Sequence, residues 1–251
     1  MTLRERYDYV MRWFEEQMPA PETELDFENP FQLLVAVILS AQCTDKRVNL
    51  VTPSLFAVYP DAHALSAATF DDVQPLIKTV SFANNKTRHL LGAAKLLVEK
   101  HSGEVPQTIE ELVLLPGVGR KTANVVVSVA WSQPAMAVDT HVFRTAARLG
   151  LTKSAKNPAE AEAQLVKHIP EALLHRAHHW LILHGRYICV ARRPHCEECG
   201  LKPACKFYEK EMQYVVRGER EMNHEKDAVH KVDGGKKRIR RDKPDDRPAL
   251  G

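Results

Sequence analysis

Four of the five cysteines fall within one short stretch of the chain. Cys189, Cys196, Cys199 and Cys205 have the spacing C-x6-C-x2-C-x5-C, and the intervening loops are just long enough to fold round one centre. Structural zinc usually takes two close pairs of cysteines, whereas a cubane iron–sulfur cluster takes four thiolates at uneven spacing. The spacing therefore favours an iron–sulfur cluster over zinc, and a metal site of either kind over four unligated thiols.

The fifth cysteine, Cys43, stands alone in the sequence LSAQCTD, where we expect a small buried thiol. An odd number of cysteines, four of them clustered, is unlike the even and dispersed set of a secreted disulfide framework. The N-terminus mixes charges of both signs without an apolar core, so it lacks the pattern of a secretory signal. The longest apolar run near the start, residues 31–39, is too short to span a bilayer. We therefore expect a cytoplasmic protein without membrane contact.

Residues 115–121, with the sequence LPGVGRK, place two glycines between two expected helices. Pro116 ends the first helix, and Gly117 and Gly119 allow a tight turn in which the backbone can approach a ligand closely. The next helix then begins with its free N–H groups directed outward, which is a phosphate-binding arrangement that does not read base sequence. The alternative is a plain turn between two helices, in which the glycines serve geometry alone.

Lys121 stands in the first turn of that second helix. The positive end of the helix dipole disfavours a cation there and favours the free, nucleophilic amine. Most lysines are solvated surface charges, so the position alone does not make Lys121 catalytic. Asp139, in the sequence AVDTHVFR, either caps the helix that runs towards Gly150 or takes part in catalysis, and the two roles are compatible.

Four histidines lie within one expected helix: His175, His178, His179 and His184. His175 and His179 have the i, i+4 spacing of a metal-binding pair, but no glutamate completes an HExxH pattern. We therefore expect these histidines to be solvated or hydrogen-bonded structural residues rather than metal ligands.

Helical periodicity runs through almost the whole chain, and no segment alternates apolar and polar residues as a half-buried strand would. Helices are expected over residues 84–100, 108–115, 120–129, 158–168 and 173–188. Gly103 is a stop signal for the first of these, and Thr108 and Glu111 form a capping box for the second. Asn157 precedes Pro158 as an N-cap. The sequence therefore predicts an all-α fold.

The net charge of +3, from 35 Lys and Arg against 32 Asp and Glu, neither supports nor opposes a polyanionic partner. A hydrophobic content of 44% is that of an ordinary globular protein, which excludes collagen-like, disulfide-scaffold and wholly disordered classes. Residues 209–251 differ from the rest, because they are highly charged and poor in aliphatic side chains. We expect a disordered tail there, with a dense basic run at residues 236–241.

The glycine turn, the lysine, the downstream aspartate and the four cysteines occur together and in this order. With LPGVGRKTA, AVDTHVFR and C-x6-C-x2-C-x5-C, the chain closely resembles the endonuclease III family of bacterial helix–hairpin–helix DNA glycosylases and AP lyases. The resemblance extends from the N-terminus to about Phe207 and leaves the tail uncovered.

The resemblance implies two all-α domains with a DNA-binding cleft between them. Residues 24–133 would form a six-helix barrel that contains the helix–hairpin–helix. Residues 1–23 together with 134–208 would form a second domain that holds a [4Fe–4S] cluster on the four cysteines. It also implies a monomer, associated with the bacterial nucleoid, that acts on double-stranded DNA with a damaged pyrimidine or an abasic site.

The family's chemistry, carried over to this chain, gives two residues a catalytic role. Lys121 would attack C1′ of the flipped-out nucleotide and displace an oxidised or ring-saturated pyrimidine, with assistance from Asp139. The resulting Schiff base would acidify the C2′ proton, and β-elimination would cut the strand on the 3′ side.

The resemblance also implies a set of DNA contacts. The residues that match phosphate contacts are Gly117, Gly119, Arg120, Arg192 and Arg193. Gln42 matches a polar residue that fills the gap left by the flipped base, and Phe82 stands where a bulky apolar wedge enters between bases. Ser81 and Ala83 replace the glycine and tyrosine that usually flank this wedge, so the resemblance says least about the loop and the lesion range.

Two alternatives remain open. The related adenine glycosylase that acts on mismatches shares the turn, the aspartate and the cysteine spacing. It lacks the lysine, however, and carries a folded C-terminal domain, for which residues 209–251 are too polar. A non-catalytic iron–sulfur DNA-binding protein would use the turn and the cluster only as a scaffold.

Overall fold

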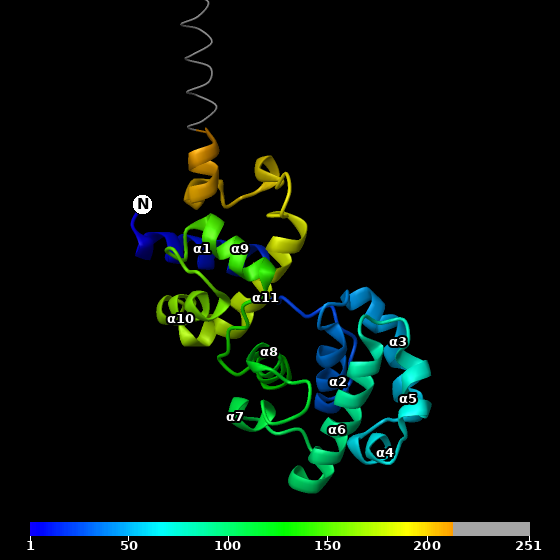
Figure 1. Ribbon diagram of the computed structural model, residues 1–251. Helices are drawn as coiled ribbons and strands as arrows, with labels where there is room; N and C mark the ends of the chain where they lie inside the picture. Colours follow the sequence, from blue (N-terminus) through cyan, green and yellow to red (C-terminus); the bar gives the residue numbers. More distant parts are fainter. Residues whose placement is uncertain (213–251) are drawn as a thin grey trace, which may run out of the picture. The chain divides into compact units, whose positions relative to one another are not determined.

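The computed structural model describes residues 1–212 of the chain. Within these residues, Met1–Lys206 form one compact unit. All regular elements of the described residues are helices, which confirms the predicted all-α fold (Figure 1). No helix within these residues combines the length and the apolar character needed to cross a bilayer.

The helices follow one another with short connections. The α-helices are α1 (Leu3–Gln17), α2 (Pro30–Ser40), α3 (Asp45–Val58), α4 (Ala62–Ser66), α5 (Phe70–Ile77), α6 (Ala83–His101), α7 (Ile109–Leu112), α8 (Arg120–Trp131), α9 (Thr140–Leu149), α10 (Pro158–His168) and α11 (Leu174–Tyr187). Three short 3₁₀ helices are η1 (Glu171–Leu173), η2 (Cys196–Glu198) and η3 (Lys202–Ala204). Residues 206–212 are helical, and the rest of the predicted tail, including the basic run 236–241, lies outside the described residues.

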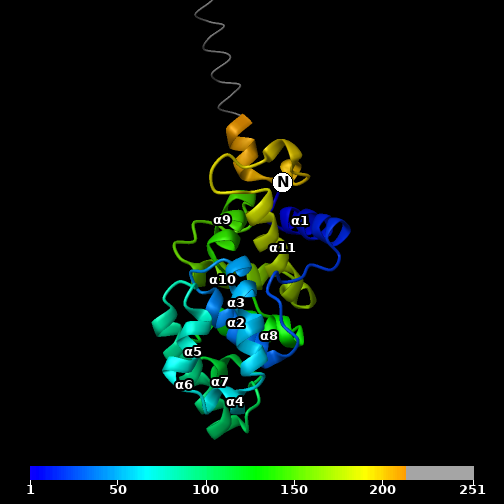
Figure 2. The same cartoon turned by 90° about the vertical axis from the view of Figure 1, so that its right-hand side faces the viewer.

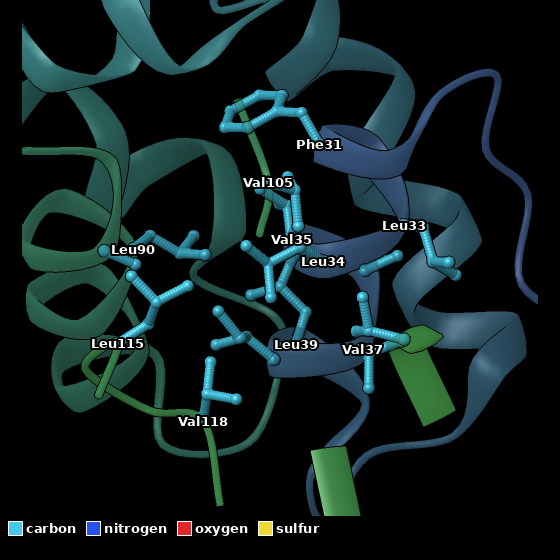
Figure 3. Close-up of a cluster of buried hydrophobic side chains, with 14 of the residues drawn as sticks. Phe31, Leu33, Leu34, Val35, Val37, Leu39, Leu90, Val105, Leu115 and Val118 are labelled. Carbon is cyan, nitrogen blue, oxygen red and sulfur yellow. The ribbon is translucent and has the colours of Figure 1, made fainter. Parts of the chain in front are cut away.

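A first hydrophobic core surrounds α2, and all its buried residues lie between Leu25 and Ala135. Helix α2 is apolar on every side, and each residue from Phe31 to Leu39 is buried. It packs against α3, α6 and α8 (Figures 1 and 2). Figure 3 shows side chains of α2 meeting Leu90 of α6 and the residues that flank the glycine turn. A helix without a polar face is stable only in such a fully enclosed position.

A second hydrophobic core lies among α1, α9, α10 and α11 and includes Leu201 and Ala204. Phe14 of α1 stacks on the fully buried Trp180 of α11, with ring centroids 5.6 Å apart and planes 6° from parallel. The indole N–H of Trp180 donates to the carbonyl of Met18 at 2.7 Å. Both cores belong to the unit Met1–Lys206, so the division into two domains stays a prediction.

Helix starts that are marked by an N-cap residue lie at the residues predicted from the sequence. Thr108 accepts a hydrogen bond from the Glu111 amide, and Asn157 accepts one from the Glu160 amide. The expected helix at 108–115 is regular only to Leu112, because the next residues form a turn that leads into the glycine segment. Cys43 is half-buried rather than buried.

Candidate functional site

The two glycines of the turn at residues 115–121 differ in whether the fold requires a glycine at that position. Gly117 has φ +81°, and a Cβ there would lie 2.7 Å from Cβ of His89, so this position requires glycine. Gly119 has φ −90°, and a Cβ there would meet nothing within 4 Å. The fold itself therefore leaves room for a side chain at Gly119. An open approach to the backbone at this point is what an external ligand would use.

Gly119 is also the N-cap of α8, and no side chain caps this helix end. The first amide N–H groups of an α-helix lack intrahelical acceptors, and with the helix dipole they attract anions. The prediction that this end of α8 is directed outward agrees with the exposure of Gly119, Arg120 and Lys121. Arg120 forms an exposed ion pair with Glu162 of α10, with 3.0 Å between the nitrogen and the oxygen.

Lys121 and Asp139 lie on different helices and line the same pocket, which has a volume of about 130 Å³. Lys121 is in the first turn of α8, and Asp139 is the N-cap of α9. One turn after Lys121, the Asn124 side chain donates to the carbonyl of Met136 at 3.3 Å. This bond ties α8 to the segment that ends at Asp139, and so fixes the two candidate catalytic residues relative to each other.

The two carboxylate oxygens of Asp139 have different surroundings. Its Oδ1 accepts a hydrogen bond from the Val142 amide at 2.8 Å, which is the predicted helix cap. The second oxygen, Oδ2, has no hydrogen-bond donor among residues 1–212. One oxygen is thus used by the fold, and the other is available to the pocket.

His178 of α11 lies in the wall of this pocket and is buried. Its Nδ1 donates to the carbonyl of Ala137 at 2.8 Å, two residues before Asp139. Burial lowers the pKa of His178 to about 3, and the neighbouring His179, Lys121 and Arg186 act in the same direction. Burial likewise lowers the pKa of His179 to about 4. Both rings are therefore neutral at pH 7, and the hydrogen-bonded structural role expected for His178 agrees with its position.

A charged network contributes further lining residues to the pocket. Arg186 of α11 donates to Asp45 at 2.6 Å and also to Glu24. The hydroxyl of Tyr187 donates to the same Glu24 carboxylate. Sequence reasoning missed Glu24, Asp45 and Arg186, because these residues are far apart in the chain and no local spacing connects them. A larger cavity of about 960 Å³ shares four lining residues with this pocket but is lined by neither Lys121 nor Asp139; the shared residues are Glu22, Thr23, Leu25 and His179.

The predicted gap-filling residue Gln42 and the predicted wedge residue Phe82 have unusual backbone conformations. Gln42 has φ +54° and Phe82 has φ +58°, although neither is glycine. Both are exposed, and 63% of the Phe82 surface is accessible. Left-handed backbone is strained in a bulky residue such as Phe82 and persists only where the surrounding structure imposes it. Gln42 follows Ser40 and Ala41, which line the pocket, whereas Phe82 does not line it.

The four cysteines follow the end of α11. None of the four is in a disulfide within the described residues, and each is half-buried. Burial raises the pKa of Cys199 to about 11, and the negative charges of the other three thiolates act in the same direction. The other three cysteines are therefore close enough to Cys199 to act on its ionisation. Such a group fits a multiply charged metal centre, which would stabilise all four thiolates together.

A single metal ion would require the four thiolates to converge on one point. Zinc–sulfur bonds of about 2.3 Å would bring tetrahedral thiolates to within about 3.8 Å of one another. Within residues 1–212, no three His, Cys, Asp or Glu side chains converge closely enough to hold one ion. The preference for a cluster of several irons over zinc therefore rests on the uneven spacing of the four cysteines in the sequence.

The loop between Cys189 and Cys196 carries two exposed arginines, Arg192 and Arg193. Arg148 of α9 holds the start of this loop by donating to the carbonyls of Val190 at 2.7 Å and Ala191 at 2.9 Å. The two loop arginines do not line the pocket of Lys121 and Asp139. The structure therefore brings together the two candidate catalytic residues, and it places the predicted phosphate contacts on the glycine turn and on a separate loop.

Comparison with known proteins gives a consistent result. Residues 35–171 match the HhH-GPD superfamily of base excision DNA repair proteins. Endonuclease III of Rickettsia felis is 47% identical over 199 residues, which are 79% of this chain and 93% of the relative. Endonuclease III of Escherichia coli K12 is 42% identical over 210 residues, which are 84% of this chain and 99% of the relative.

Among solved structures, a trapped covalent intermediate of endonuclease III with DNA matches this chain with a TM-score of 0.79 and 42% identity. The match covers 84% of this chain and all of the other. The family predicted from the sequence motifs is thus confirmed by relatives that share most of the length. The chain belongs to the HhH-GPD superfamily of base excision DNA repair proteins and, within it, to the endonuclease III family of DNA glycosylases with AP lyase activity.

Proposed function

We propose that this protein removes oxidised or ring-saturated pyrimidines from double-stranded DNA and then cuts the strand 3′ to the abasic site. The observation that carries the proposal is the pocket shared by Lys121 and Asp139, in a chain of the endonuclease III family. An enclosed pocket of this kind can receive one base only after the base has left the stack. The protein acts as a monomer on the bacterial nucleoid.

The first step is nucleophilic substitution at the sugar. The Nζ lone pair of Lys121 attacks C1′ of the damaged nucleotide, and the C1′–N glycosidic bond breaks as the base leaves with its electron pair. The free Oδ2 of Asp139 accepts the proton that the lysine must lose and stabilises the positive charge that develops on the sugar. The neutral rings of His178 and His179 add hydrogen-bonding groups without competing positive charge.

The second step is elimination from the covalent intermediate. Opening of the sugar leaves a Schiff base between Lys121 and C1′, which makes the C2′ proton acidic. Loss of that proton, with its electrons forming the C2′–C3′ double bond, expels the 3′ phosphate and cuts the strand. Hydrolysis then returns the Lys121 amine. A trapped covalent complex has been described for a similar endonuclease III, which supports a covalent route here.

The phosphate backbone is held at two places in this proposal. The free amides at the start of α8, with Gly119 leaving the approach open, bind one phosphate. Arg120 adds a positive charge at the same point once its ion pair with Glu162 is replaced by one with the phosphate. Arg192 and Arg193 contact the backbone from the cysteine loop, while Gln42 and Phe82 occupy the space that the flipped base leaves.

The four cysteines hold a [4Fe–4S] cluster in this proposal: Cys189, Cys196, Cys199 and Cys205. Bound there, the cluster supplies covalent cross-links between segments with little regular structure and takes no part in the reaction. Its role is to keep the loop of Arg192 and Arg193 in one conformation. We further propose that the first and second hydrophobic cores correspond to two domains, residues 24–133 and residues 1–23 with 134–208.

Borohydride reduction of the Schiff base tests the proposal. Wild-type protein should become covalently linked to DNA that contains an abasic site, and Lys121→Ala should give no such adduct. Lys100→Ala, which removes an exposed lysine from the end of α6, should be trapped like wild type. Normal trapping of Lys121→Ala would exclude Lys121 as the nucleophile.

The substrate class is tested with the same variants on duplexes that carry defined lesions. Release of an oxidised pyrimidine followed by strand cleavage is expected. Release of adenine from a mismatch without strand cleavage would assign the protein to the related adenine glycosylases. Binding without any product would indicate a non-catalytic DNA-binding protein.

A further inference from the structure

Lys86 of α6 is a buried cation to which the proposed mechanism gives no role. Only 4% of its surface is exposed. Its Nζ donates a hydrogen bond to the carbonyl of Leu39 at 2.7 Å. A buried ammonium group is costly unless it is compensated, and an apolar side chain would pack against the first core at lower cost. Packing alone therefore does not explain why a lysine occupies this position.

At one end, Lys86 stabilises the turn that carries Gln42. Leu39 is in the last turn of α2, where backbone carbonyls lack intrahelical donors and the helix dipole is negative. The Lys86 ammonium supplies both a donor and a positive charge at this point. Immediately afterwards the chain turns, with the Cys43 amide bonded to the Ser40 carbonyl at 3.0 Å and Gln42 in left-handed backbone.

At the other end, Lys86 belongs to the first turns of the helix that begins after Phe82. The Lys86 amide donates to the Phe82 carbonyl at 3.1 Å. One residue is thus bonded through its side chain to the last turn of α2 and through its backbone to the first turn of α6. Phe82 is the N-cap of α6, lies in left-handed backbone and receives no side-chain cap. For a bulky residue this conformation is strained, and it persists only where neighbouring structure imposes it.

We propose that Lys86 is a positioning residue that fixes the turn of Gln42 and the turn of Phe82 relative to each other, so that both side chains enter the DNA duplex together. The inference rests on the proposed function, because that function gives both side chains a place in the duplex. Lys86 itself does not touch the DNA in this role. It acts through the backbone of two strained, exposed turns that are separated by about forty residues of chain.

The inference predicts an effect that depends on the form of the DNA. A base in a duplex must be unstacked, and the gap must be filled, before Lys121 can react. An abasic site in single-stranded DNA needs neither step. Loss of the Lys86 ammonium should therefore slow the reaction on duplex DNA and leave the reaction on single-stranded DNA nearly unchanged.

Lys86→Met is the variant that tests this, because it keeps the length and volume of the side chain and removes the charge and the donor. Replacing a buried charge by an apolar group of similar shape is often tolerated by the fold. Lys95→Met, at an exposed position of the same helix, is the matched control. Lys86→Gln is measured alongside as a second variant without the charge.

The measurement is the single-turnover rate of strand cleavage at an abasic site, in duplex and in single-stranded DNA. For both Lys86 variants the ratio of duplex to single-stranded rates should fall about tenfold, the loss expected from one hydrogen bond to a charged group. Lys95→Met should keep the wild-type ratio. An equal loss on both forms of DNA, or no loss on either, would refute the positioning role.

Hydrogen exchange in the free protein tests the coupling without reference to activity. In Lys86→Met, amides of residues 40–44 and 82–86 should both exchange faster, while those of α8 stay as in wild type. Faster exchange in one turn only, or in neither, would overturn the inference. A wild-type protein that cleaves no abasic DNA would contradict the proposed function, and the exchange result would still decide whether Lys86 couples the two turns.

Discussion

Asp139 illustrates how one side chain can serve both the fold and the chemistry. Its Oδ1 is used by the Val142 amide, and its Oδ2 is free within the described residues. From the sequence alone, capping and catalysis could not be separated, because both place an aspartate before a helix. In the structure, Oδ1 serves the helix cap, and Oδ2 is available for the proposed catalytic role. Substitutions can therefore test the two roles separately.

Asp139→Asn should keep the cap, since its side-chain oxygen can accept from Val142, and should lose the carboxylate that assists the lysine. We expect a melting temperature near that of wild type and base excision slower by about a hundredfold or more. Asp139→Ala should show the same kinetic loss and also lose about 1 kcal/mol of stability. Thermal melting and single-turnover excision separate the two effects.

Asn157→Ala is the control for cap loss alone. Asn157 caps α10 through a 2.9 Å bond to the Glu160 amide and does not line the pocket. It should lower the melting temperature as Asp139→Ala does and leave excision intact. Wild-type excision rates in Asp139→Asn would remove this carboxylate from the mechanism.

The sequence identified residues whose type and neighbours are informative by themselves. Lys121 beside two glycines, Asp139 before a helix and the clustered cysteines all belong to this class. Glu24, Asp45 and Arg186 were not predicted, because their meaning comes from a contact between distant segments. Lys86 was missed for a similar reason, since a single lysine in a helical sequence predicts solvent exposure and its burial becomes visible only in three dimensions.

Among the elements, α11 combines core packing with one wall of the pocket. Trp180 and Leu181 are in the second core, while His178 and His179 line the pocket. The histidines that crowd this helix could not be ranked from sequence, because His178 and His179 differ only in the helix face that they occupy. Burial distinguishes His178, which holds the backbone before Asp139.

The buried, neutral His178 makes the stability of the protein depend on pH. Its pKa of about 3 in the folded state lies below the value of about 6.5 in an unfolded chain, so the unfolded chain takes up the proton first. The stability that His178 contributes is complete above about pH 6.5 and is lost as the pH falls towards 3. At pH 5 the loss from this residue should be about 2 kcal/mol.

His178→Asn provides the measurement, because the asparagine amide can replace Nδ1 as donor to the Ala137 carbonyl and does not titrate. Between pH 7 and pH 5 the melting temperature should fall less in this variant than in wild type. His63→Asn, which replaces an exposed histidine in α4, should behave like wild type. An unchanged pH dependence in His178→Asn would mean that His178 is protonated in the folded protein.

The helices themselves were largely predictable, because their ends are marked by local signals. Gly150 ends α9 in left-handed backbone, and Asn157 with Pro158 begins α10, both as expected. The short α7 ends earlier than predicted, since its capping box fixes the first turn only and the glycine turn sets the path of the chain after Leu112. Which helices pack together could not be read from the sequence motifs and came from the family resemblance.

At the scale of the whole molecule, the cysteine loops belong to the second core. Leu201 and Ala204, which lie between the last cysteines, are buried in that core. Arg6 of α1 donates to the carbonyls of Leu149 and Ala204, so the first helix is bonded directly to the last loop. A metal centre on the cysteines should therefore stabilise the second core more than the first.

Metal analysis should find about four irons per chain in the purified protein, and one zinc would contradict the cluster. Cys199→Ser should lose the iron, whereas Cys43→Ser, at a half-buried cysteine outside the loops, should retain it. Hydrogen exchange in Cys199→Ser should rise in α1 and α11 and stay low in α2 and α6. A uniform rise across both cores would argue against two domains.

The two cores also differ in which parts of the chain form them, and therefore in when those parts are synthesised. The first core takes its residues from one continuous stretch, Leu25 to Ala135, whereas the second joins α1 to residues from Met136 onward. A ribosome releases the N-terminus first, and domains fold as units once their chain is complete. The first core can close while the rest is still being made. Helix α1 emerges before the first core, and Phe14 stays without its stacking partner Trp180 until α11 has been made.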